Sequence, residues 1–132
     1  MLQIFCDGGA RGNPGPAAYG FVVFENGKVI YEEGGYIGIA TNNFAEYTAV
    51  ISALSWLKDN NYKEKLNFFL DSKLVVSQVN GLFKVKSSKM RELLVKVRQL
   101  ETSFETIRYN YIPRDRNQHA DYQVNKALDE KL

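Results

Sequence analysis

The strongest constraint on the fold lies near the start of the chain, where glycines and prolines crowd behind a short apolar segment. The alternating pattern of Leu2–Cys6 predicts a β-strand. The next ten residues, Asp7–Pro16, hold four glycines and two prolines, which argues against a helix or a long strand and predicts a tight, exposed turn. The Asp7 carboxylate would then stand near a strand end, beside backbone that can approach a ligand closely.

This turn has a simpler reading as a plain hairpin connection. The sequence excludes two phosphate-binding motifs. It is not a Walker loop, because no Lys-Ser or Lys-Thr pair follows the last glycine, and its glycines do not have the G-x-G-x-x-G spacing. The turn alone therefore does not indicate a function.

Length and composition favour one globular domain over residues 1–132, since 45% of the residues are hydrophobic and 24% are charged. The chain has no apolar run long enough for a membrane span and no signal peptide, so a cytoplasmic protein without membrane contact is expected. A single cysteine, Cys6, excludes an internal disulfide and a cysteine-based zinc site. The net charge of +2 permits nucleic-acid binding without indicating it.

Hydrophobic periodicity and turn signals predict five strands and four helices. The first three strands form an antiparallel meander, with Asn26-Gly27 as a hairpin turn, and strand–helix alternation follows, which is typical of a mixed sheet covered by helices. The predicted strands are Leu2–Cys6, Tyr19–Phe24, Val29–Tyr36, Leu66–Leu70 and Ile107–Ile112. The predicted helices are Asn43–Lys58, Ser72–Val79, Met90–Leu100 and Asn117–Leu132.

Four acidic residues stand at the ends of these elements: Asp7 and Asp71 at strand ends, Glu46 and Asp121 in the first turns of helices. Each has an ordinary explanation, because acids complement the helix dipole and cap the segment that follows. Strand ends in α/β sheets gather at one edge, however, and four carboxylates brought there would repel one another unless cations neutralised them. Such hard oxygen ligands suit Mg²⁺ or Mn²⁺.

Four blocks of the sequence follow one another in a characteristic order: Phe5–Gly15, Thr41–Glu46, Leu70–Ser72 and Arg114–Asp121. Together they resemble type 1 ribonuclease H, the family that cuts the RNA strand of RNA–DNA hybrids. The resemblance implies an α/β, ribonuclease H-like fold. Its five-stranded mixed sheet would have three antiparallel strands followed by two parallel strands, flanked by helices.

The resemblance also implies that the four acids, Asp7, Glu46, Asp71 and Asp121, are the catalytic, metal-binding carboxylates. Two Mg²⁺ ions, with Mn²⁺ as an alternative, would activate a water and stabilise the departing 3′ oxygen, which leaves 5′-phosphate and 3′-hydroxyl ends. The 2′-hydroxyl that marks RNA would be read by the glycine turn and by asparagine side chains. The implied substrate-binding residues are Gly8, Gly9, Ala10, Asn13, Thr41, Asn42, Asn43, Ser72, Lys73 and Arg114.

Two departures from the family pattern stand out. Many members insert a basic helix that grips the DNA strand, and Asn80–Lys89 is too short to hold it, although Lys84, Lys86 and Lys89 could replace it in part. The chain also lacks the long loop that carries a histidine before the last aspartate. His119 lies two residues before Asp121, so on a helix it should point away from the carboxylates.

Three other readings remain open at this point. The chain could be a binding module that holds nucleic acid without cutting it, a related nuclease that also accepts double-stranded RNA or belongs to a reverse transcriptase, or a metal-free structural protein. The presence of all four acids favours an enzyme. A start at Met1 and an end just beyond the last helix favour a free-standing enzyme, and a monomer is expected.

Overall fold

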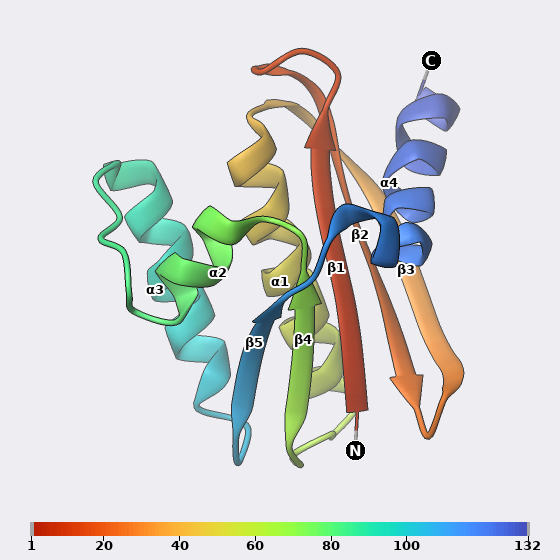
Figure 1. The fold of residues 1–132 in the computed structure, drawn as a ribbon, viewed down its shortest axis with the longest axis vertical. Coiled ribbons are helices and arrows are strands. Elements are labelled where there is room, and N and C mark those ends of the chain that lie inside the picture. Colours follow the sequence, from red (N-terminus) through yellow and green to blue (C-terminus); the bar gives the residue numbers. More distant parts are fainter. Residues whose placement is uncertain (1, 132) are drawn as a thin grey trace.

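The structure of the protein is a computed structural model that describes residues 2–131. Five strands, four α-helices and one short 3-10 helix, η1, follow one another along the described chain (Figure 1). The strands are β1 Leu2–Ala10, β2 Gly15–Glu25, β3 Lys28–Ala40, β4 Leu66–Leu70 and β5 Ile107–Tyr111. The helices are α1 Asn42–Asp59, α2 Lys73–Val79, α3 Ser88–Glu101, η1 Arg114–Arg116 and α4 Gln118–Lys131.

The strands form one mixed sheet in the order β3-β2-β1-β4-β5. β1 and β3 each pair with β2 in antiparallel fashion, whereas β1 with β4 and β4 with β5 are parallel pairs. The predicted mixed sheet of three antiparallel and two parallel strands is therefore confirmed. β1 stands at its centre, where the antiparallel part meets the parallel part.

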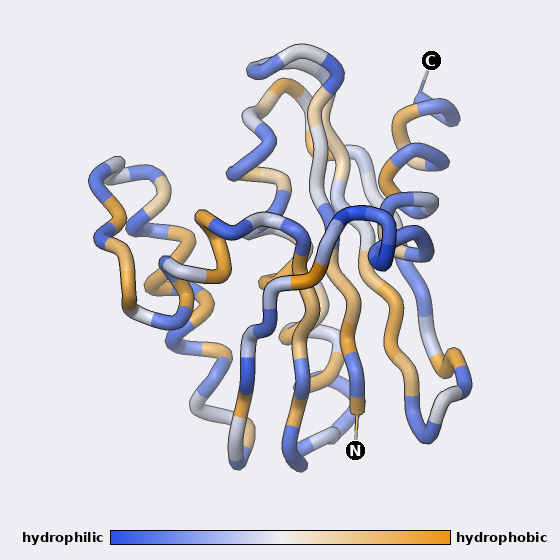
Figure 2. The backbone as a smooth tube through the Cα atoms, viewed as in Figure 1, coloured by the Kyte–Doolittle hydropathy of each residue, from blue (hydrophilic) through white to orange (hydrophobic). Residues whose placement is uncertain are grey.

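Two apolar clusters lie on opposite faces of this sheet. The larger one joins β1, β2, β4 and β5 to α1, α2 and α3, and it includes Ile4, Phe21 and Tyr47. The smaller one joins Ala18 of β2 to Val124 and Leu128 of α4. Figure 2 shows the apolar colour along the central strands, whereas the turn after β1 and the segment of η1 are hydrophilic. Buried apolar surface thus holds α1 and α4 on either side of β1.

The structure corrects one prediction about the glycine turn. β1 does not end at Cys6 but continues through Asp7, Gly8 and Gly9 to Ala10, because β2 pairs with it in unbroken register as far as Ala10↔Ala17. The tight turn is confined to residues 11–14. Pairing with a neighbouring strand outweighs the low strand propensity of glycine, so Asp7 lies inside a strand and not at its end.

Two other strands, β2 and β3, also differ from their predicted segments by several residues, and the remaining boundaries differ by one or two residues. β2 and β3 extend beyond the predicted segments because they pair along nearly their whole length, from Gly15↔Ala40 to Glu25↔Lys28. The last helix begins one residue later than predicted, after η1, and Leu132 lies outside the described residues. No helix in the described part of the chain has the length and apolar character that a membrane span requires.

Candidate active site

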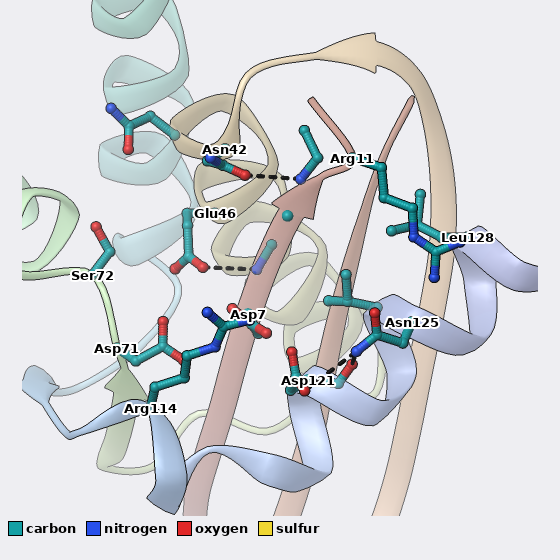
Figure 3. Close-up of a pocket in the computed structure, with 15 residues that line it drawn as sticks. Asp7, Arg11, Asn42, Glu46, Asp71, Ser72, Arg114, Asp121, Asn125 and Leu128 are labelled. Carbon is teal, nitrogen blue, oxygen red and sulfur yellow. Dashed lines mark hydrogen bonds between the residues drawn. The ribbon is translucent and has the colours of Figure 1, made fainter. Parts of the chain in front are cut away.

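The site lies where β1 extends beyond its pairing with β4. β1 pairs with β4 only as far as Phe5↔Phe69, while its pairing with β2 runs on to Ala10. The edge of β1 beyond Phe5 is therefore open to α1. Gly8 donates its backbone N–H to Glu46 Oε1 at 2.8 Å, and Ala10 donates its N–H to Asn42 Oδ1 at 2.8 Å (Figure 3). Side chains of α1 thus take the place of a neighbouring strand.

The close approach of α1 to β1 depends on a missing side chain. A Cβ atom on Gly8 would overlap the backbone carbonyl of Ala45 and the backbone nitrogen of Glu46. The neighbouring Gly9 is different, because a Cβ there would meet Val124 Cγ1 at an ordinary 3.6 Å. Gly8 is therefore the residue that lets the Glu46 carboxylate reach the strand that carries Asp7.

The structure brings the four predicted acids to one cavity of about 600 Å³. Asp7 comes from β1, Glu46 from α1, Asp71 from the residue after β4 and Asp121 from the first turn of α4. One carboxylate oxygen from each of Asp7, Glu46 and Asp71 lies within 4.8 Å of the other two. Asp121 lies on the α4 side of the same cavity, and its carboxylate faces Asp7 in Figure 3.

Burial and mutual repulsion both oppose ionisation here. Burial, followed by the charges of Asp71 and Asp121, raises the pKa of Asp7 to about 7. Burial and the neighbouring Asp7 also raise the pKa of Glu46 well above its usual range. The second oxygen of that carboxylate, Glu46 Oε2, is buried and has no hydrogen-bond partner among the described residues. Clustered carboxylate oxygens with an unpaired acceptor fit hard divalent cations, whose charge would favour the ionised form.

The raised pKa of Asp7 predicts how pH affects the stability of the metal-free protein. Between about pH 4 and pH 7 the folded protein keeps a proton on Asp7 that the unfolded chain has already released. Raising the pH through this window therefore favours unfolding, by a few kcal/mol at most. Thermal unfolding in a chelating buffer at pH 5 and pH 8 measures the effect. The difference between wild type and Asp7→Asn isolates the carboxylate, and an unchanged difference at the two pH values would contradict the assignment.

Seven of the ten predicted substrate-binding residues line the cavity: Gly8, Gly9, Ala10, Asn42, Asn43, Ser72 and Arg114. The other three do not. Asn13 Oδ1 accepts the backbone N–H of Asn42 at 3.0 Å, Thr41 caps α1 by accepting from Phe44 N, and the Lys73 ammonium lies 5.2 Å from the Tyr111 ring centre. Asn13 and Thr41 therefore shape the asparagine-bearing end of α1 and do not face the cavity.

His119 behaves as its spacing predicts. Its ring stacks on Phe24, with the ring centres 5.6 Å apart, beside a separate cavity that is also lined by Phe5 and Arg116. The prediction that it points away from the carboxylates is confirmed.

Sequence reasoning missed three polar residues at the site. Arg11 lines the cavity and forms an ion pair with Asp129 at 2.6 Å. Asn125 donates to the carboxylate of Asp121 at 3.3 Å, and Asn117 donates to that of Asp71 at 3.0 Å. Arg11 and Asn117 stand inside recognised sequence blocks, whereas only helical spacing from Asp121 could have pointed to Asn125.

Comparison with known proteins extends these observations. The family described as "Reverse transcriptase-like" matches residues 5–127. The bifunctional protein Rv2228c of Mycobacterium tuberculosis is 43% identical over 97% of this chain and 35% of its own length. Ribonuclease HI of Halobacterium salinarum is 39% identical over 98% of this chain and 65% of its own length. The chain thus spans about a third and about two thirds of these relatives.

A solved structure is similar in both fold and sequence over nearly the whole chain. LC11-RNase H1, in complex with an RNA/DNA hybrid, superimposes with a TM-score of 0.94 at 38% identity, over 99% of each chain. The match includes every element that surrounds the carboxylate cavity, since it leaves almost none of the chain out.

Proposed function

Since the chain belongs to the type 1 ribonuclease H family, we propose that it is an endoribonuclease that cleaves the RNA strand of RNA–DNA hybrids. The observation that carries the proposal is the cavity in which one oxygen from each of Asp7, Glu46 and Asp71 lies within 4.8 Å of the other two, with Asp121 on the facing helix. The similar LC11 enzyme, whose structure holds an RNA/DNA hybrid, supports the choice of substrate.

Divalent cations, which we take to be two Mg²⁺ or Mn²⁺ ions, would be held by Asp7, Glu46, Asp71 and Asp121. When bound, such ions supply an activated water and a Lewis acid for the departing oxygen. Of the protein groups, Glu46 Oε2 offers an unpaired acceptor, while Glu46 Oε1 is kept in place by the Gly8 N–H. The raised pKa of Asp7 implies that metal binding displaces a proton below about pH 7 and should strengthen as the pH rises through about 7.

Recognition of the RNA strand falls to neutral amides beside the carboxylates. Asn42 Oδ1 already accepts the Ala10 N–H, so the Nδ2 group of Asn42 remains as the donor for a ribose hydroxyl or a phosphate. Asn43 and Ser72 line the same cavity on its α1 and α2 sides. Arg114, which lies next to Asp71 in Figure 3, supplies a positive charge for a phosphate. No contact of this kind reads a base, so cleavage should be independent of base sequence.

Cleavage assays with three labelled duplexes test this proposal: an RNA–DNA hybrid, double-stranded RNA and double-stranded DNA, each with Mg²⁺ and with a chelator. We expect Mg²⁺-dependent cleavage of the hybrid, with 5′-phosphate and 3′-hydroxyl ends, and none of double-stranded DNA. Double-stranded RNA is the second candidate substrate, because it presents the same 2′-hydroxyls. Binding of the hybrid without any cleavage in Mg²⁺ or Mn²⁺ would favour a binding module.

A chemically modified hybrid tests the role of the 2′-hydroxyl separately. Deoxy substitution next to the scissile phosphate leaves every phosphate in place but removes the hydroxyl that the Asn42 and Asn43 amides would contact. We expect cleavage at the substituted position to fall by about tenfold or more, the scale of one or more lost hydrogen bonds. Equal rates on both hybrids would restrict these asparagines to shaping the start of α1.

A further inference from the structure

Asn117 is a buried amide at the junction between η1 and α4, and it is only 1% exposed. Its Nδ2 group donates to the backbone carbonyl of Cys6 at 2.8 Å and to Asp71 Oδ2 at 3.0 Å. Its own backbone carbonyl accepts the N–H of Asp121 at 3.1 Å. One residue thus contacts Asp71, the backbone of Asp121 and the carbonyl next to Asp7.

The orientation of this amide follows from its partners. A backbone carbonyl is always an acceptor, so the group that faces Cys6 must be the NH₂ and not the oxygen. Asn117 Oδ1 is consequently left buried and without a hydrogen-bond partner among the described residues. An unpaired buried acceptor costs free energy, and a residue chosen for stability alone would avoid it. The hydrogen bonds that Asn117 donates to Cys6 and Asp71 therefore offer a reason for an asparagine at this position beyond stability.

Asp71 needs such a partner because of its place in the chain. It follows Leu70, the last residue of β4, so the hydrogen-bond ladder of the sheet ends before it. Asp7 and Glu46 are fixed by a strand and by a helix packed on that strand, whereas Asp71 stands in the segment that leads into α2. Repulsion from Asp7 and Glu46 would push a free Asp71 side chain outward.

We propose that Asn117 is a positioning residue, which ties the Asp71 carboxylate to β1 and to the start of α4 so that the acids keep a spacing that binds divalent cations. This inference rests on the proposed function, because it assumes that the carboxylates hold metal. Hydrogen bonds from such outer residues orient ligands and typically change metal affinity by about 10- to 100-fold.

A matched control variant distinguishes an effect on the position of Asp71 from a general loss of fold stability. Asn110 is also an asparagine whose Nδ2 group donates to a strand carbonyl, that of Phe68 at 3.0 Å, but it is not among the residues that line the carboxylate cavity. Asn110→Ala and Asn117→Ala each delete one amide-to-strand bond. Only Asn117→Ala removes a bond to a carboxylate of the cavity.

The test measures binding of Mn²⁺ to the protein without nucleic acid, by calorimetry or by electron paramagnetic resonance. We expect Asn117→Ala to weaken Mn²⁺ binding by about 10- to 100-fold, and Asn110→Ala to leave it within about twofold. In an Asp71→Asn background, Asn117→Ala should cause little further loss, because the bond acts through Asp71. Circular dichroism and thermal unfolding confirm that each variant is folded.

The outcomes distinguish the inference from its premise. If wild type binds no Mn²⁺, the metal-dependent function itself fails. If wild type binds Mn²⁺ and folded Asn117→Ala binds it equally well, only the role of Asn117 is overturned.

If Asn117→Ala does not fold, NMR spectra of the wild-type protein still test the proposal. The two side-chain amide protons of Asn117 should exchange slowly in NMR spectra, and the signal of the group should shift when Mg²⁺ is added. Fast exchange, or a signal that Mg²⁺ leaves unchanged, would overturn the proposal.

Discussion

Asp71→Asn is expected to lower the rate of RNA cleavage by on the order of a thousandfold or more, while the protein stays folded and still binds the hybrid. The amide has nearly the shape of the carboxylate, and its oxygen can still accept the Asn117 hydrogen bond. It cannot supply an anionic oxygen to a divalent cation. The substitution also removes one charge that opposes ionisation of Asp7, so the metal-free variant should unfold at a higher temperature than wild type.

Single-turnover cleavage in Mg²⁺, hybrid binding in a chelator and thermal unfolding together measure these effects. Asp115→Asn is the matched control, because Asp115 lies on η1 beside the cavity that contains His119 and not among the residues of the carboxylate cavity. Full activity of a folded Asp71→Asn protein would rule out the metal-dependent mechanism at this site.

Gly8→Ala is expected to destabilise the fold by at least about 3 kcal/mol, because the new methyl group would overlap backbone atoms of Ala45 and Glu46 and not flexible side-chain ends. α1 would have to move away from β1, which breaks the bond between the Gly8 N–H and Glu46 Oε1. Glu46 would then leave the neighbourhood of Asp7. Activity should therefore fall even under conditions in which the variant remains folded.

Gly9→Ala provides the stability control at the next residue of the same strand. Its added methyl group would meet only Val124 Cγ1, at 3.6 Å, so its free energy of unfolding should stay within about 1 kcal/mol of wild type. Urea denaturation of both variants gives the comparison. If Gly8→Ala and Gly9→Ala were equally stable, the contact between the backbones of β1 and α1 would not limit the position of Glu46.

Hydrophobic periodicity and turn and capping residues predicted most of the strands and helices. The apolar segment Leu66–Leu70, closed by Asp71, predicted the bounds of β4 without error, and the Ser72 and Asn80 signals placed α2 within a residue. These elements depend on local hydrophobic period and on capping, which a single sequence displays directly. The four acids were also identified correctly as neighbours, because their sequence blocks pointed to one region of the sheet, although Asp7 lies inside β1 and not at its predicted end.

Features that depend on partners far along the chain were not predictable in this way. Nothing in the composition of Asp7–Ala10 shows that β2 will extend it as a strand, and glycine propensity argues the opposite. Asn117 looked like an ordinary residue at a helix start, since its hydrogen bond to Cys6 spans 111 positions of sequence. The bond that Asn13 Oδ1 accepts from the Asn42 N–H also spans 29 positions of sequence, and contact of Asn13 with the substrate stays a prediction.

The long span of the Asn117–Cys6 contact also bears on when activity can arise during folding. β1 carries Asp7 near the beginning of the chain, but Asp71 lacks its tether and Asp121 lacks its position until α4 docks on the sheet. Such non-local contacts form late and slowly compared with local ones. An incompletely folded or newly synthesised chain should therefore lack the assembled carboxylate centre, so the proposed cleavage would become possible only after the domain is complete.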